Sequence, residues 1–253
     1  VDAFVDFGSY KTMQGKVLAW HDAGTRESYL TIRNQRPQIT LPKTREAIYH
    51  VGKRCVKFNN DPLVVELLAR HRLGAYAAPM VEAGQNFYAY DWVEGESLYY
   101  HPEQWKRFFA WCHHRLWSSR PTVDISSACH EFYQIKTMRR VHEYLLMRPG
   151  DEHATVVDGV ACQYVWDKLV AVDWDKLGQT SVATKLWHGD LQFDNILLKT
   201  DGDFCLLDLR SDFGPQSDYG DVYYDLAKLY GGLLINYGRL KSGACHVDFR
   251  DNT

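Results

Sequence analysis

The sequence lacks the features that mark membrane-spanning, secreted and strongly nucleic-acid-binding proteins. No apolar run reaches the roughly 18 residues that a membrane-spanning helix needs. The net charge is −3, so there is no excess of basic residues for nucleic acid or an anionic membrane surface. The six cysteines are scattered and contain no Cys-x-x-Cys pair, which favours free thiols in a reducing compartment. With no basic-then-apolar leader at the start, we expect a cytoplasmic protein with no membrane or nucleic-acid partner.

The first part of the chain is rich in short apolar runs typical of β-strands. At 253 residues the chain is long enough for one large domain or two lobes. Residues 1–37 form a poorly readable extension with two short β runs. Strands are expected at 39–41, 47–51 and 54–58, and a strand leading into a hinge at 86–98. A helix is expected to start at Asn60 or Asp61, with Pro62 in its first turn, and to end by Gly74.

The second part of the chain has apolar residues at helical spacing. Helices are expected at 102–119, 131–147, 160–172 and 226–237. Strands followed by helices predict an α+β fold.

A polar stretch between these helices carries the candidate chemistry. Residues 187–198 read Trp-His-Gly-Asp-Leu-Gln-Phe-Asp-Asn-Ile-Leu-Leu, and residues 204–208 read Phe-Cys-Leu-Leu-Asp. Asp201-Gly202 between them predicts a β-hairpin turn. Folding this hairpin brings Asp208 back beside Asn195, with Asp190 on the same small surface.

These three side chains are the parts of a phosphoryl-transfer site. Carboxylate and amide oxygens, here from Asp208 and Asn195, are ligands that Mg²⁺ takes while it also holds phosphate oxygens. Asp190, which is not on the metal, is placed to accept a hydroxyl proton. His188 is expected to brace the loop rather than to transfer protons.

The joined pattern His-x-Asp-x-x-x-x-Asn, hairpin and Leu-Leu-Asp resembles the catalytic loop and metal-binding aspartate of the protein-kinase-like superfamily. The version His-Gly-Asp-Leu with Asn-Ile-Leu resembles its aminoglycoside phosphotransferase and choline kinase branch. Residues 220–229 resemble the Asp-Leu-Ala helix start of that branch. The resemblance implies a bilobal kinase-like fold, with a β-rich N-terminal lobe over residues 1–93 and a helical C-terminal lobe over residues 94–253. It also implies a protein that binds ATP and Mg²⁺ and phosphorylates a small-molecule hydroxyl acceptor.

The same resemblance implies roles for residues of the N-terminal part. Lys57 would grip the α- and β-phosphates of ATP, with Glu66 of the next helix as its partner. Backbone groups from Asp91 to Val93 would hold the adenine edge. The connector at 42–46 lacks the glycines of a protein kinase, so Thr44 would offer its hydroxyl and N–H to phosphate. An ordinary hairpin loop is the alternative for this connector.

Three other functions are open at this point. The missing glycines leave a catalytically inactive nucleotide-binding module as an alternative. A metal hydrolase built on His188, Asp190 and Asp194 needs more converging histidines than the sequence offers. A protein substrate is disfavoured because no activation segment with an Ala-Pro-Glu end follows Asp208.

Two further expectations concern the sequence after the hairpin. Asp225 is expected to accept N–H bonds from the catalytic loop, and Asp212-Phe213-Gly214 is read as a chance match to a kinase motif. The acceptor is left open among sugars, amino alcohols and aminoglycosides. The last two are cations and would want carboxylates or an aromatic cage.

Overall fold

The computed structural model describes residues 46–70, 73–148, 156–157 and 159–235. The chain divides into two units, residues 1–42 and 43–253, and everything described belongs to the second. The expected strands in residues 1–41, and Thr44, lie outside the described residues. The lobe boundary at 93–94 stays a prediction.

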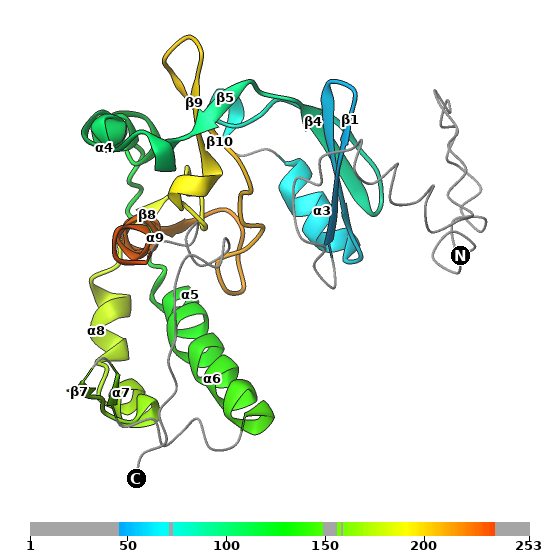
Figure 1. Cartoon of the computed structure of the whole chain (residues 1–253). Helices are drawn as coiled ribbons and strands as arrows, with labels where there is room; N and C mark the ends of the chain where they lie inside the picture. The colour runs from blue at the N-terminus through cyan, green and yellow to red at the C-terminus, as the bar shows by residue number, and fades with distance from the viewer. Residues whose placement is uncertain (1–45, 71–72, 149–155, 158, 236–253) are drawn as a thin grey trace, which may run out of the picture. The chain divides into compact units, whose positions relative to one another are not determined.

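A four-stranded antiparallel sheet forms the first described part of the chain (Figure 1). Its strands are, in spatial order, β1 Glu46–Val51, β2 Arg54–Asn59, β4 Phe87–Asp91 and β3 Met80–Ala83. The strands expected at 47–51 and 54–58 are confirmed, and they pair as a hairpin. Alternate residues of β2 are buried, and they include Cys55 and Lys57. One face of this sheet is therefore turned toward the rest of the described chain.

Helix α3, Pro62–Ala69, follows β2 directly. The Asp61 carboxylate accepts the Leu63 N–H at 3.0 Å and caps the helix, as the sequence predicted. The helix is shorter than expected, because it ends at Ala69 rather than near Gly74. Val65 is buried, and α3 contacts β2, β3 and β4.

The predicted hairpin is present, and two of the candidate site residues flank it: Asn195 precedes its first strand and Asp208 follows its second. Strand β9, Ile196–Lys199, pairs antiparallel with β10, Phe204–Leu206. The turn between them has Gly202 at φ 85°, a conformation that glycine adopts without strain. The other edge of β9 pairs with β5, Gly95–Ser97, the segment that follows the expected hinge.

Helices make up most of the later chain. Their bounds are α4 Trp105–Trp111, α5 Ser126–Cys129, α6 Lys136–Met147, α7 Val165–Val170, α8 Trp174–Gln179 and α9 Val222–Leu234. Helix α4 continues as a π-helical turn over Cys112–Leu116, and another π-helical turn, His130–Ile135, joins α5 to α6. The helices expected at 102–119 and 131–147 are therefore confirmed.

Two other helix predictions need correction. The helix expected at 160–172 begins only at Val165, because Val160–Ala161 forms strand β7 with β6, Val156–Val157. Helix α9 begins at Val222, one turn before the expected start. The Asp221 carboxylate caps it by accepting the Tyr223 N–H at 3.1 Å. Asp221 belongs to β11, Gly220–Asp221, which pairs with β8, Ala183–Thr184.

The described core fixes the hairpin and the loop before it. Leu191 and Phe193 of that loop are buried with Phe108 of α4, Leu206 of β10 and Leu229 of α9. A second buried cluster surrounds Phe213 and contains Phe132 and Trp187. An antiparallel sheet followed by a mainly helical part is the α+β class expected of a kinase-like bilobal fold. Within the described ranges, no helix is long and apolar enough to cross a bilayer.

Candidate active site

The loop of residues 188–195 begins with a backbone conformation that needs glycine. Gly189 has φ 80°, and a Cβ atom there would clash with the Trp187 ring and with Cβ of Arg210. Gly220 of β11 approaches the same indole so closely that a Cβ there would also clash. The Trp187 ring therefore packs against backbone at both positions and holds the start of the loop against β11.

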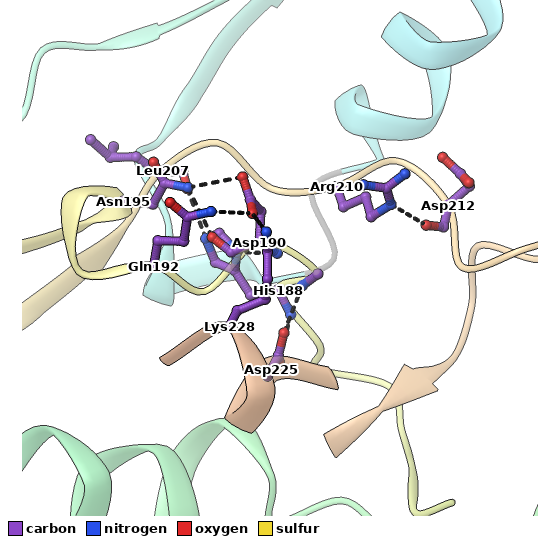
Figure 2. Close-up of polar contacts among 10 residues, drawn as sticks. His188, Asp190, Gln192, Asn195, Leu207, Arg210, Asp212, Asp225 and Lys228 are labelled. Carbon is purple, nitrogen blue, oxygen red and sulfur yellow. Dashed lines mark hydrogen bonds and ion pairs between the residues drawn. The ribbon is translucent and has the colours of Figure 1, made fainter. Parts of the chain in front are cut away.

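A buried carboxylate from α9 anchors this start. Asp225 accepts the His188 N–H at 3.0 Å and the Gly189 N–H at 2.7 Å (Figure 2). The Trp117 indole N–H adds a third bond at 3.4 Å. The structural role predicted for Asp225 is confirmed. Because these donors satisfy the buried charge, the loop is tied to α9 at two consecutive residues.

His188 uses both ring nitrogens inside the protein. Nδ1 accepts the Asp190 N–H at 3.1 Å, so Nε2 carries the proton that bonds to the Leu207 carbonyl at 2.7 Å. The imidazole braces the loop against the hairpin, as expected. It is not placed as a metal ligand, which contradicts the metal-hydrolase alternative. Across the residues that the structure describes, no group of three or more His, Cys, Asp or Glu side chains could hold a metal ion.

Asp190 is held by side chains from its own loop and from α9. Its carboxylate accepts from Lys228 Nζ at 2.7 Å, Gln192 Nε2 at 3.1 Å and Asn195 Nδ2 at 3.3 Å (Figure 2). The sequence analysis did not assign Lys228 a role. Its spacing was an available signal, because Lys228 is three residues after Asp225 and so shares its side of the helix.

Asp208 and Asn195 lie at the same end of the hairpin. The Leu207 N–H donates to the Asn195 carbonyl at 2.8 Å, which brings Asn195 next to Asp208, the residue after Leu207. Asp208 has φ 57°, a left-handed conformation that Asp tolerates better than most residues. The Asn195 amide nitrogen also donates to the Asp190 carbonyl at 2.8 Å, so its amide oxygen is the atom that a metal would take.

The Asp208 carboxylate forms an ion pair with the Lys57 ammonium. Lys57 is buried, and 151 positions separate the two residues along the chain. The residues present fit Mg²⁺, because an aspartate and an amide oxygen are ligands of the right kind and the carboxylate already binds a cation. The structure thus brings Lys57, Asp190, Asn195 and Asp208 together, as the sequence predicted.

Glu66 lies elsewhere than expected. It forms an exposed ion pair with Arg70 at 3.0 Å, one turn along α3. The neighbouring Val65 is the buried residue of this helix, which leaves Glu66 on its solvent-exposed side. The carboxylate that contacts the Lys57 ammonium is that of Asp208 instead.

Two backbone N–H groups of the expected hinge already donate hydrogen bonds to backbone carbonyls of the protein. The Asp91 N–H donates to the Pro79 carbonyl at 3.0 Å, and the Trp92 N–H donates to the Lys53 carbonyl at 2.8 Å. Val93 follows immediately, where the chain leaves β4. An adenine-binding role for Asp91 and Val93 stays a prediction.

One cavity connects the residues of the site. It has a volume of about 620 Å³ and is lined by Lys57, Asp190 and Asp208, together with Arg140 of α6 and Arg210. The two arginines were not predicted as site residues. They reach the cavity through the packing of α6 and of the segment after β10, which no short motif encodes.

Comparisons with known proteins find similarity among solved structures. No protein-family model matches the sequence, and the comparison with curated proteins gave no match. Among solved structures, the chain is similar to a chain in the streptomycin–ATP–APH(2″)-IIa ternary complex. The TM-score is 0.41 with 14% sequence identity, over 81% of this chain and 73% of that chain.

Proposed function

We propose that the protein is an ATP- and Mg²⁺-dependent phosphotransferase that phosphorylates a hydroxyl group of a small molecule. The observation that carries this proposal is the ion pair between Lys57 and Asp208 at a cavity that Asp190 also lines. Phosphoryl transfer needs an ammonium that binds phosphate, a carboxylate that binds the metal, and a second carboxylate, not on the metal, that accepts the hydroxyl proton.

Each residue has a separate task in this proposal. Lys57 binds phosphate oxygens of the nucleotide, and backbone groups from Asp91 to Val93 hold the adenine. Asn195 and Asp208 hold Mg²⁺, which when bound stabilises charge on the phosphates. Thr44 is retained as a phosphate-binding candidate from the sequence alone.

Asp190 accepts the proton of the acceptor hydroxyl. Its carboxylate is already oriented by Lys228, Gln192 and Asn195 before any substrate binds. Such positioning supports catalysis because little reorganisation is then needed at the moment of transfer. The Lys228 ammonium also places positive charge next to the position where the phosphoryl group would pass.

The test is ADP release with Mg²⁺-ATP and a panel of sugars, sugar phosphates, amino alcohols and aminoglycosides. On the acceptor that this panel finds, Asp190→Asn should lower kcat by roughly 10²–10⁴-fold, the usual contribution of a general base. Calorimetric ATP affinity should stay nearly unchanged, because Asp190 is not assigned to the nucleotide. A variant that turns over like the wild type would contradict the assigned role. Mg²⁺-dependent ATP binding without ADP release on any acceptor would favour the inactive nucleotide-binding module.

A further inference from the structure

Four cationic side chains lie close to one another beside the cavity that Asp190 lines. Arg140 of α6 and Arg210 line the cavity itself. Lys136 lies one helical turn before Arg140, and Lys228 of α9 contacts Asp190 at 2.7 Å. These residues come from three separate segments, so the fold rather than one basic run brings them together.

Aromatic packing fixes two of these cations. Lys136 Nζ lies 3.6 Å from the centre of the Phe132 ring, and the Arg210 guanidinium carbon lies 4.9 Å from the same centre. Arg210 also donates from Nε to the Asp212 carbonyl at 3.1 Å (Figure 2). The two cations are therefore held in place beside one ring instead of ranging through solvent.

Among the residues that the structure describes, the carboxylates identified beside the cluster are fewer than its cations. Asp190 is matched by Lys228, and Asp208 is matched by Lys57. The Asp212 carboxylate also acts on Lys136. Burial lowers the pKa of Lys136 to about 7, and the nearby charges of Arg210, Arg140 and Lys228 add to this effect. Positive charge is thus in local excess, and an anion would relieve the repulsion.

We infer that the phosphate acceptor is itself an anion, a hydroxylated small molecule that carries a phosphate or carboxylate group bound by Arg140 in the cavity, with Lys136 adding positive charge nearby. This inference rests on the proposed function and narrows its substrate. A guanidinium matches the planar, two-oxygen geometry of either anionic group. The same cations repel amino alcohols and aminoglycosides, which are positively charged.

The proposed reaction then has the following steps. The anionic group holds the acceptor so that its hydroxyl faces Asp190. The acceptor oxygen bonds to the γ-phosphorus while the bond to the β,γ-bridging oxygen breaks. The hydroxyl proton passes to Asp190, and ADP leaves.

The first experiment compares matched acceptors that differ in charge. Glucose, glucose 6-phosphate, glucuronate and glucosamine share one ring and offer neutral, phosphate, carboxylate and cationic forms. We expect kcat/KM to be at least about tenfold higher for one of the two anions, as a charged hydrogen bond of 1.5–3 kcal/mol provides. Comparing the phosphate with the uronate identifies the anionic group.

The second experiment uses neighbouring arginines as a matched pair. Arg140→Gln should raise KM for the anionic acceptor about tenfold or more, because the charged hydrogen bond to the anionic group is lost. The KM of ATP should change far less. Arg139→Gln is the control, because Arg139 is exposed, pairs with Glu143 at 3.9 Å and does not line the cavity. It should leave both KM values unchanged.

Two results would overturn the inference while the proposed function stands. One is equal or better turnover of the neutral or cationic sugar. The other is an Arg140→Gln variant whose KM for ATP rises and whose kcat falls equally with every acceptor, which would assign these cations to the nucleotide. If no acceptor gives ADP, the proposed function fails. Calorimetric binding of the sugar phosphate and uronate to wild type and Arg140→Gln then still decides whether an anion site exists, and equal binding refutes it.

Discussion

Lys136 is a half-buried ammonium, and the charges that act on it within the described residues include the cations Arg140, Arg210 and Lys228 and the Asp212 carboxylate. Its pKa in the folded protein is about 7, below its ordinary value of 10.5. Between these two pH values the unfolded chain binds the proton more tightly, so folding stability rises with pH. The full free-energy cost of burying Lys136 applies below about pH 7, and this cost is gone above about pH 10.5.

We therefore predict a pH-dependent gain in stability for Lys136→Met, which keeps the length of the chain over Phe132. The melting temperature should rise at pH 6, and the gain should shrink as the pH approaches 10. Thermal unfolding followed by circular dichroism at both pH values measures this. A gain that is the same at both would mean that the substitution acts through packing alone.

At the residue scale, the motifs identified Lys57, Asp190, Asn195 and Asp208 correctly as neighbours, because a short hairpin and two fixed spacings hold three of them. The same reasoning missed Lys136, Arg140 and Lys228. The spacing of Lys228 from Asp225 was a usable signal, but the positions of Lys136 and Arg140 depend on how α6 packs, which sequence spacing does not encode. Glu66 was misplaced for a similar reason, since its orientation depends on which side of α3 faces the sheet.

Helix α9 anchors the start of the 188–195 loop through the side chain of Asp225. Replacing it with alanine leaves the N–H groups of His188 and Gly189 buried without their acceptor. We expect Asp225→Ala to lower the free energy of unfolding by about 3 kcal/mol or more, because each buried donor left without an acceptor costs about 1–3 kcal/mol. Turnover should fall as well, since Asp190 is carried by the same loop.

Urea unfolding and steady-state turnover measure the two effects. Asp218→Ala is a suitable control, because Asp218 is exposed in the segment before β11. Asp225→Asn should lie between wild type and alanine, as it keeps one uncharged acceptor. An alanine variant as stable as wild type would show that the two N–H groups find other acceptors.

At the element scale, the hairpin, the first two strands and the long helices were predictable from turn residues and apolar spacing. Helix ends were less so. The start of α9 depends on Asp221, whose carboxylate also accepts the Val182 N–H at 2.9 Å and the Tyr133 hydroxyl at 2.7 Å. These tertiary contacts select Asp221 as the cap, and no local pattern distinguishes it from Asp225.

Across the described molecule, the ion pair between Lys57 and Asp208 joins β2 to the end of the hairpin. If Mg²⁺-ATP takes over both partners, the folded state gains stability by mass action. At about 100 times the dissociation constant this gain is about 2.7 kcal/mol. We predict that Asp208→Asn abolishes the Mg²⁺-dependent part of this gain.

Melting temperatures measured with ATP and Mg²⁺, and again with ATP and a chelator, isolate the Mg²⁺-dependent part of the stability gain. Asp167→Asn on α7 serves as the control, because Asp167 is exposed and far along the chain from the site. An Asp208→Asn variant that keeps the full Mg²⁺-dependent shift would move the metal site elsewhere. At this scale the α+β class was predictable from strands followed by helices, whereas the cavity and its charge were not.

The contact of Trp187 with Gly220 also has a consequence for how related sequences should vary. Gly220 does not share the positive φ of Gly189, and the atoms that a side chain there would meet first belong to the Trp187 indole ring. A smaller residue at position 187 would make room for alanine at position 220, but not at position 189, where the backbone conformation itself requires glycine. Positions 187 and 220 should therefore change together among homologues, while position 189 stays invariant.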